Sequence, residues 1–463
     1  VGGYFLMKSG SCNVQQVASL FSQSGYNYDP AQFNKASIYE GLDETNPKNA
    51  LPEAVSLLRF APSRLNQGQQ GSCVAWSSAY AAQTILTAAA TGQDPNSIRF
   101  SPSYLYNQIR LDGCEGSYVQ RAMESMQRNG GVPLSDYPYN DQDCERMPTS
   151  SDIQEGRQNV IHGFTRLTNG DNLDQISMAA IKEHLAKDAP VVIGMMVGQS
   201  FMQPMMGQDV WRPQGMDQSQ MGMGGHAMCV IGYDDSKYGG AFQIMNSWGP
   251  EWGNNGIGWV RYADFKNYVR EAYGVDPLPK RSAVSNIPLE CTIGLVKNDD
   301  KKYIALKNSG SDLFETVSPI TVGTRFKMEV QNATECYIYI FGQEVDGSSY
   351  VLFPYTPKHS PYCGITGYRL FPRGQSMEAD DKGTRDYIAI VVSKDALDYN
   401  ALNTAISQGT QADYEGKVNN ALKSMAIRSV RFNNTPDGTI HFKADANDNK
   451  AVATIVAFDK TAR

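Results

Sequence analysis

The sequence has little histidine and little cysteine, and it has no long apolar run. Five histidines and eight cysteines occur in 463 residues, a cysteine content far below that of a disulfide-built scaffold. The longest apolar stretch, residues 189–198, is much shorter than the roughly 18 residues of a membrane-spanning helix. We therefore expect no transmembrane segment, and only a few residues can supply a thiol nucleophile or an imidazole base.

The chain also lacks a strong excess of either charge. Its formal net charge is −7, 19% of its residues are charged and 41% are hydrophobic. That composition is typical of a globular protein and gives no reason to expect a nucleic acid partner. Two short stretches, DGS at 346–348 and DANDN at 445–449, lack the full ligand spacing of a calcium loop. We predict no metal site and no cofactor.

The composition changes along the chain in a way that predicts two main domains. An irregular extension, 1–50, holds one helical patch at 14–23; we interpret it as a strap or a short propeptide and favour the strap. Within 51–276, helical patterns come first and strand-like runs follow. This order indicates a two-lobed α+β domain. A linker, 277–290, leads to an all-β sandwich-like domain at 291–463, interrupted by one helix at 399–427.

Individual elements of the α+β region follow from caps and periodicity. Ser101–Pro102 predicts a helix start, and one face of the helix predicted at 171–188 is charged. We expect His184 to be solvated on that face. The predicted helices are 73–89, 101–110, 118–131 and 171–188. The predicted strands are 190–197, 226–234, 242–249 and 256–265.

One cysteine stands where a reactive thiol would be useful. Cys73 ends the polar stretch NQGQQGSC and opens the predicted helix. The positive end of a helix dipole favours the thiolate and lowers the pKa of a cysteine placed there. Gly71 and Ser72 leave the sulfur approachable, so Cys73 is the candidate nucleophile.

A thiolate nucleophile needs a base and a group that orients the base. His226 follows the flexible GMGG and opens a strand, and Asn246 ends the next strand. Neighbouring strands can bring these side chains within hydrogen-bonding distance. An amide that orients an imidazole beside a thiolate is the Cys-His-Asn form of a catalytic triad.

Three blocks, NQGQQGSCVAW, GGHAMCVIGYDD and NSWGPEWGNNGIGWVRY, together resemble the papain-like cysteine peptidases, and YPY at 137–139 agrees. The resemblance covers roughly 51–275 and points to a bacterial member. It implies that Cys73 is the nucleophile, that His226 is its ion-pair partner and general acid, and that Asn246 orients the imidazole. It further implies that Trp248 shields the His226–Asn246 bond and that Gln67 belongs to the oxyanion hole.

The resemblance also implies where substrate binds. GCEGSY at 113–118 resembles the family's glycine loop, whose backbone pairs with an extended peptide, so Gly116 and Ser117 are candidates. Ala227 and a methionine-rich loop suggest a small or apolar preference in the substrate. The remaining substrate-binding candidates are Gly225, Ala227 and Trp248.

Several positions depart from the family pattern. Gln70 stands where relatives have a cysteine, which leaves Cys114 without that partner, and Cys144 is the candidate substitute for a Cys114–Cys144 disulfide. Ser117 replaces a glycine and could narrow the groove. Gly225 stands where Asp or Asn often precedes the histidine, which could change the pH profile.

Other residues have structural interpretations. Cys229 lies inside an apolar strand, and we predict a core residue. Nine of the eighteen methionines fall between 195 and 228. This cluster is open to three interpretations: a loosely packed insert loop, a soft hydrophobic wall near the cleft, or a thioether copper site.

The resulting hypothesis is an extracytoplasmic cysteine peptidase that acts on protein or peptide substrates through an acyl-enzyme, its secretion signal absent from this chain. The region beyond residue 285 resembles a β-rich domain of unknown function and could bind a protein or cell-surface partner. The alternatives are an acyl transferase or ligase with the same triad, and a catalytically silent binding protein.

Overall fold

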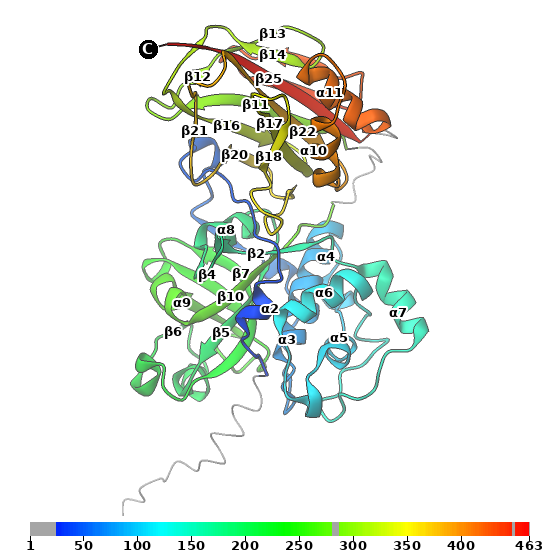
Figure 1. Cartoon of the computed structure of the whole chain (residues 1–463). Helices are drawn as coiled ribbons and strands as arrows, with labels where there is room; N and C mark the ends of the chain where they lie inside the picture. The colour runs from blue at the N-terminus through cyan, green and yellow to red at the C-terminus, as the bar shows by residue number, and fades with distance from the viewer. Residues whose placement is uncertain (1–24, 280–286, 447–449, 463) are drawn as a thin grey trace, which may run out of the picture. The chain divides into compact units, whose positions relative to one another are not determined.

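The computed structural model describes residues 25–279, 287–446 and 450–462, so the helical patch expected at 14–23 lies outside the described residues. The chain divides into two compact units (Figure 1). The first unit joins residues 25–36 to 52–279, and the second joins 37–51 to the C-terminal region. The extension expected at 1–50 is therefore shared between the units. Among the described residues, no helix is long and apolar enough to cross a membrane.

The helical part of the first unit begins at Cys73. Residues 73–91 form one continuous helical run, which Gly92 ends in a left-handed conformation (φ 72°). Ser101 caps the next helix by accepting a hydrogen bond from the Tyr104 amide, as the Ser-Pro signal predicts. The segments are α2 (Pro30–Phe33), α3 (Cys73–Ala75), a π-helical stretch (Trp76–Gln83), α4 (Thr84–Thr91), α5 (Pro102–Ile109), α6 (Val119–Asn129) and α7 (Ser150–Gly156).

The other part of the first unit is a mainly antiparallel sheet, on the opposite side from α3–α7 (Figure 1). Its order is β2-β10-β5-β7-β8-β9-β6, and β1 pairs with β7. The expected α+β, two-lobed architecture is confirmed. The strands are β1 (Ala54–Ser56), β2 (Phe164–Arg166), β5 (Val191–Val197), β6 (Val210–Trp211), β7 (Gly224–Asp234), β8 (Ala241–Met245), β9 (Ile257–Arg261) and β10 (Val269–Val275), and α9 (Tyr262–Tyr268) joins the last two.

Two predictions for residues 171–188 are wrong. The first residues form a hairpin, β3 (Thr168–Asn169) with β4 (Asn172–Ile176), and the helix α8 (Met178–Leu185) begins later, capped by Ser177. His184 is fully buried rather than solvated, because α8 packs this face onto β10. Gly274 makes room for it: a Cβ there would lie 2.4 Å from Nε2 of His184.

The second unit is a sandwich of two sheets with helices over one outer face (Figure 1). The first sheet has the order β20-β16-β11-β24-β23, with β12 on β11 and β21 on β16; the second has the order β13-β14-β25-β22-β17-β18, with β15 on β25 and β19 on β17. Apolar side chains fill the space between the sheets. The strands are β11 (Leu289–Lys297), β12 (Tyr303–Ile304), β13 (Leu306–Asn308), β14 (Leu313–Thr316), β15 (Ile320–Thr321), β16 (Arg325–Asn332), β17 (Cys336–Gln343), β18 (Ser349–Phe353), β19 (Tyr362–Cys363), β20 (Gly367–Phe371), β21 (Met377–Glu378), β22 (Arg385–Ser393), β23 (Arg431–Asn434), β24 (Ile440–Ala444) and β25 (Ala451–Thr461).

The single helix expected at 399–427 is two helices, α10 (Tyr399–Ser407) and α11 (Tyr414–Leu422). The break falls at Gly409, and Asp413 caps α11 by accepting from the Gly416 amide. Both helices cover the face of the second sheet that points away from the sandwich interior.

Residues 37–51 protect an edge of the first sheet in the second unit. The amide of Asp43 and the side-chain amide of Asn49 both donate to the carbonyl of Tyr368 in β20, each at 2.8 Å. The amide of Tyr368 in turn donates to Oδ1 of Asn49 at 2.9 Å. An edge strand whose polar groups are satisfied in this way cannot recruit another chain.

Candidate active site

Cys73 occupies the first position of α3, as the sequence predicts, and its side chain is fully buried. The backbone amide of Ala227, the residue after His226, donates to its sulfur at 3.4 Å. This contact joins the helix start to strand β7, so it brings together the two parts of the first unit at the thiol.

His226 and Asn246 are brought together by the pairing of β7 with β8. Nε2 of His226 donates to Oδ1 of Asn246 at 2.7 Å, and both side chains are buried. The ring of Trp248 stacks on the imidazole with 4.3 Å between the ring centroids and 22° between the planes. Nε2 is engaged with the amide, whereas Nδ1 is buried and has no hydrogen-bond partner among the described residues.

Gln67 is fully buried and held by three hydrogen bonds. Its Nε2 donates to the carbonyl of Gln70 at 2.9 Å, and its Oε1 accepts from the hydroxyl of Ser247 at 2.7 Å. Its backbone amide also donates to the carbonyl of Ser247 at 2.8 Å. The amide group is therefore fixed between the loop before Cys73 and the residue after Asn246.

Burial is the largest cause of the pKa shifts of Cys73 and His226. It raises the pKa of the Cys73 thiol to about 12, although the backbone amides of Ala227, Val74 and Cys73 itself lower it. Burial lowers the pKa of His226 to about 4, and the hydrogen bond that His226 donates to Asn246 partly offsets this. The sequence predicts a lowered thiol pKa from the helix alone; in this state desolvation outweighs the helix, so the neutral pair is favoured.

A segment of the chain itself covers the predicted substrate groove. Residues 25–27 run parallel to Ser117: the Ser117 amide donates to Gly25 at 2.9 Å and the Asn27 amide donates to Ser117 at 3.0 Å. Glycines make this approach possible, because a Cβ on Gly116 would lie 2.2 Å from the Gly25 carbonyl and one on Gly225 would lie 2.3 Å from the Tyr26 carbonyl. The Ser117 hydroxyl does not project into the groove; it donates to the Ile109 carbonyl at 2.8 Å.

The Tyr26 side chain enters a pocket that ends in a buried carboxylate. Its ring lies where a Cβ on Gly194 would be 2.1 Å away, and its hydroxyl donates to Glu271 at 2.6 Å. The Tyr273 hydroxyl donates to the other carboxylate oxygen at 2.5 Å. Burial raises the pKa of Glu271 to about 7, and the two hydroxyls lower it only in part. Sequence reasoning missed Glu271, because no local motif marks it. The carboxylate also means that the pocket is not apolar throughout.

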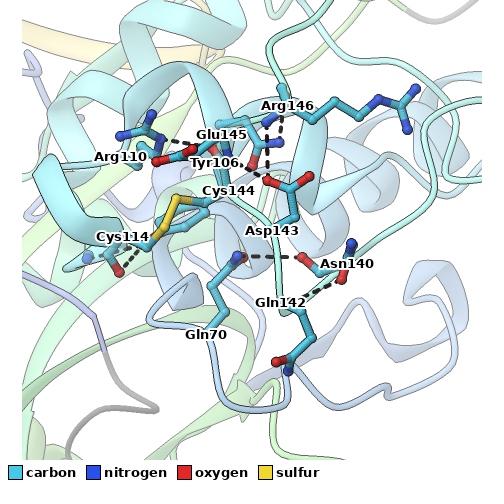
Figure 2. Close-up of a disulfide and its surroundings, with 12 residues drawn as sticks. Gln70, Tyr106, Arg110, Cys114, Asn140, Gln142, Asp143, Cys144, Glu145 and Arg146 are labelled. Carbon is cyan, nitrogen blue, oxygen red and sulfur yellow. Dashed lines mark hydrogen bonds between the residues drawn. A yellow bond between two sulfur atoms is a disulfide. The ribbon is translucent and has the colours of Figure 1, made fainter.

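Cys114 and Cys144 form a disulfide with their Cα atoms 6.1 Å apart (Figure 2). Figure 2 also shows Gln70, which stands where relatives have the cysteine; its Nε2 lies 3.4 Å from the Asn140 carbonyl. Arg110 donates to the Cys144 carbonyl at 2.8 Å. The disulfide therefore ties the glycine loop to the segment after YPY.

The remaining candidates divide between the core and the surface. Cys229 is fully buried in β7, and Ala227 is buried beside Cys73. The methionine-rich region is mixed: Met195, Met202, Met205 and Met228 are buried, whereas Met206, Met216 and Met221 are exposed. Its short 3₁₀ turns lie between β5 and β7.

Comparison with known proteins agrees with this geometry. The family model of the papain family cysteine proteases matches residues 60–276. Over 193 residues the chain is 30% identical to cathepsin K of Mus musculus, which covers 41% of this chain and 53% of that protein. It is 27% identical over 237 residues to an uncharacterized peptidase C1-like protein of Acanthamoeba polyphaga mimivirus, covering 48% of this chain and 69% of that protein.

Among solved structures, xylellain, a cysteine protease from Xylella fastidiosa, is similar with a TM-score of 0.46 and 21% identity, covering 55% of this chain and 97% of that one. The chain spans about half the length of the mouse cathepsin K. Residues 60–276, which bring Cys73, His226 and Asn246 together, belong to the papain family of cysteine proteases.

Proposed function

We propose that the protein hydrolyses peptide bonds through Cys73. The observation that supports this most strongly is the joint placement of the Cys73 sulfur against the Ala227 amide and of His226 against Asn246. The thiolate attacks the peptide carbonyl, His226 protonates the leaving amine, and the same imidazole then activates water to release the acyl group. Gln67 and the Cys73 amide stabilise the oxyanion.

The test is hydrolysis of a mixed peptide library by wild type, Cys73→Ala and Cys229→Ala. Cys229 is an equally buried thiol of the same unit, so its variant controls for loss of a core sulfur. We expect cleavage by wild type and Cys229→Ala and none by Cys73→Ala. Cleavage that survives in Cys73→Ala contradicts the proposal, and amide products with an added amine identify the transferase alternative.

We further propose that residues 25–28 restrain the enzyme by occupying its cleft. The support is the pairing of Gly25 and Asn27 with Ser117 and the burial of Tyr26, which is 5% exposed. While the segment is in place, Cys73 and His226 have no exposed surface. This assigns residues 25–28 to inhibition and residues 37–51 to the strap role.

A pair of variants separates inhibition from simple packing. Tyr26→Ala removes the buried ring and its bond to Glu271, whereas Asn27→Ala removes only an exposed bond to the Glu115 carbonyl. We expect the rate of hydrolysis to rise strongly in Tyr26→Ala and weakly in Asn27→Ala. Unchanged or lower rates in both variants would show that the segment does not restrain the site.

The Tyr26 pocket also supports a substrate preference. Once the segment leaves, Glu271 presents a carboxylate to a long substrate side chain that ends in a hydrogen-bond donor, namely tyrosine, lysine or arginine. Glu271→Gln should lose the preference for lysine and arginine, and Glu271→Leu should also lose the preference of tyrosine over phenylalanine. A wild type that cleaves phenylalanine and tyrosine peptides equally and rejects cationic ones contradicts this assignment.

We also propose an extracytoplasmic location, supported by the Cys114–Cys144 disulfide. Non-reducing peptide mapping of the protein from its native source tests it: a bonded pair agrees, and two free thiols would oppose it. Binding of a protein or cell-surface partner by the second unit stays a prediction.

A further inference from the structure

Arg166 of β2 is a fully buried cation that the proposed catalysis does not use. Its Nη1 donates to Oδ1 of Asn34 at 3.0 Å, whereas its Nε and Nη2 have no hydrogen-bond partner among the described residues. Its ion pair with Asp171 is long, at 3.7 Å, and the Asp171 side chain is 65% exposed. A buried guanidinium with two unsatisfied nitrogens carries a free-energy cost that a better acceptor removes.

Arg166 lies next to the residues that form the Tyr26 pocket. Tyr273, whose hydroxyl donates to the Glu271 carboxylate, is the register partner of Arg166 in the pairing of β10 with β2. Directly opposed residues place their side chains on the same face of a sheet, about 5 Å apart. Burial is the largest cause that raises the pKa of Tyr273, and the charge of Arg166 opposes it. The guanidinium therefore stands beside the wall of the pocket.

The end of the covering segment occupies the place in front of Arg166. Phe33 is fully buried, and its ring meets Tyr273 edge-on with 5.2 Å between the ring centroids. Asn34, which follows it and ends α2, meets Arg166. On its other side α2 packs against α6, so it lies between the two parts of the first unit (Figure 1).

The covering segment also shows which way this place lies from the nucleophile. The described segment begins at Gly25, which packs on Gly71, two residues before the nucleophile. It reaches Arg166 only after it has passed the Tyr26 pocket and Tyr273. At about 3.3 Å per residue, an extended peptide needs two or three residues to cover the distance from the pocket to Arg166.

We propose that Arg166 determines specificity by binding the carboxylate of a substrate aspartate or glutamate. This residue lies two or three positions from the one in the Tyr26 pocket, on the side away from the scissile bond. The inference rests on the proposed peptidase function and on departure of residues 25–34 from the cleft. A carboxylate at the place of Asn34 accepts from Nη1 and Nη2 together, whereas only Nη1 donates to the Asn34 oxygen.

Asp171 competes with such a substrate for the same guanidinium. Burial is the largest cause that lowers the pKa of Arg166, and the charge of Asp171 opposes it. The Asp171 carboxylate also repels an incoming carboxylate, so its removal should strengthen the preference for an acidic residue. Arg166→Met keeps an unbranched apolar chain and removes the cation, so it should abolish the preference.

The experiment uses the full chain with Tyr26→Ala and Phe33→Ala, which removes both buried rings of the segment. We measure kcat/KM for peptides with tyrosine for the Tyr26 pocket and with glutamate, glutamine or lysine two or three positions away. We expect glutamate to exceed glutamine by about tenfold in kcat/KM, with lysine lowest. In the same background Arg166→Met should make glutamate and glutamine equal, and Asp171→Asn should widen their difference.

Equal values of kcat/KM for glutamate and glutamine with Arg166 intact, or a preference that persists in Arg166→Met, overturn the inference and leave the peptidase function standing. Failure of every protein to cleave any peptide overturns both. If Arg166→Met does not fold, the peptide series and Asp171→Asn still decide, because they report on the intact guanidinium.

Discussion

Buried polar groups have different roles in the two units. In the first unit Gln67, His226, Asn246 and Glu271 are at most 3% exposed; His226 is bonded to Asn246, and Glu271 is bonded to Tyr26. In the second unit the buried Arg369 is bonded to the Glu40 and Ile365 carbonyls and to Asn332, which fixes backbone segments in place. The difference teaches that burial of a polar side chain indicates chemistry only where such groups share a groove and their pKa values are displaced.

The largest expected effect comes from removing the base. His226→Ala should lower kcat by roughly 10⁴–10⁶-fold, because the thiol then has no proton acceptor and the leaving amine no donor. Steady-state hydrolysis measures this. His184→Ala provides the comparison, since His184 is just as buried and its Nδ1 lies 2.7 Å from the Ala180 carbonyl of its own helix. Equal losses in kcat in the two variants would break the distinction drawn between the cleft and other buried polar groups.

The core of the second unit offers the opposite test. Phe442 is fully buried between the sheets, so Phe442→Ala should lower the free energy of unfolding by about 3–5 kcal/mol. Denaturant unfolding monitored by circular dichroism measures the change. The kcat per folded molecule should stay at the wild-type value, and a large loss of kcat would make the second unit part of the catalytic machinery.

Gln67→Ala should lower kcat by roughly 10²–10³-fold, because one oxyanion donor is lost. Gln67→Glu keeps the shape but replaces the donor with a carboxylate, so it should be no better than alanine. Comparison of kcat and KM for both variants checks this. A rise in KM with unchanged kcat would assign Gln67 to substrate binding instead.

The smallest expected effect is a pH dependence. Glu271 has a pKa of about 7 in the folded chain against an ordinary 4.5, so the folded state holds its proton more tightly. Its contribution to stability is complete below about pH 4.5 and is lost as pH rises through 7, by about 3 kcal/mol. Glu271→Gln should remove this slope.

The measurement is the free energy of unfolding of wild type and Glu271→Gln at pH values from 5 to 8. The pH dependence of wild-type stability combines two opposing contributions. The contribution of Glu271 falls as pH rises, whereas that of His226, whose pKa is lowered, falls as pH decreases. The difference between the two proteins cancels the His226 contribution. A difference that does not change with pH would show that Glu271 titrates normally.

Much of the cleft is predictable from local patterns. A cysteine after a glycine-rich loop begins a helix, a histidine opens one strand and an asparagine ends the next. The pairing of β7 with β8 then brings the histidine and the asparagine together. The disulfide follows from the family resemblance and a missing partner at Gln70. Each of these depends on short segments whose conformation the sequence specifies on its own.

The features that were missed depend on distant segments. Glu271 gains its role from Tyr26, which lies 245 residues away in the chain. Asn49 meets Tyr368 only because residues 37–51 fold onto β20. His184 is buried because Gly274 on another element leaves space for its ring. The sequence pattern near each of these residues does not predict which distant residues it contacts.

We propose that Cys73 is a nucleophile that residues 25–28 of the same chain cover. The direct measurement is the rate at which a thiol-directed epoxide labels Cys73 in wild type, Gly25→Ala and Gly170→Ala. A Cβ on Gly25 would lie 2.0 Å from the Gly71 carbonyl, whereas one on Gly170 meets nothing within 4 Å, although both glycines have positive φ.

We expect Gly25→Ala to raise the labelling rate at least about tenfold, because the clash displaces the segment, and Gly170→Ala to leave the rate at the wild-type value. Equal rates in all three proteins, or labelling of any cysteine other than Cys73, would contradict this proposal.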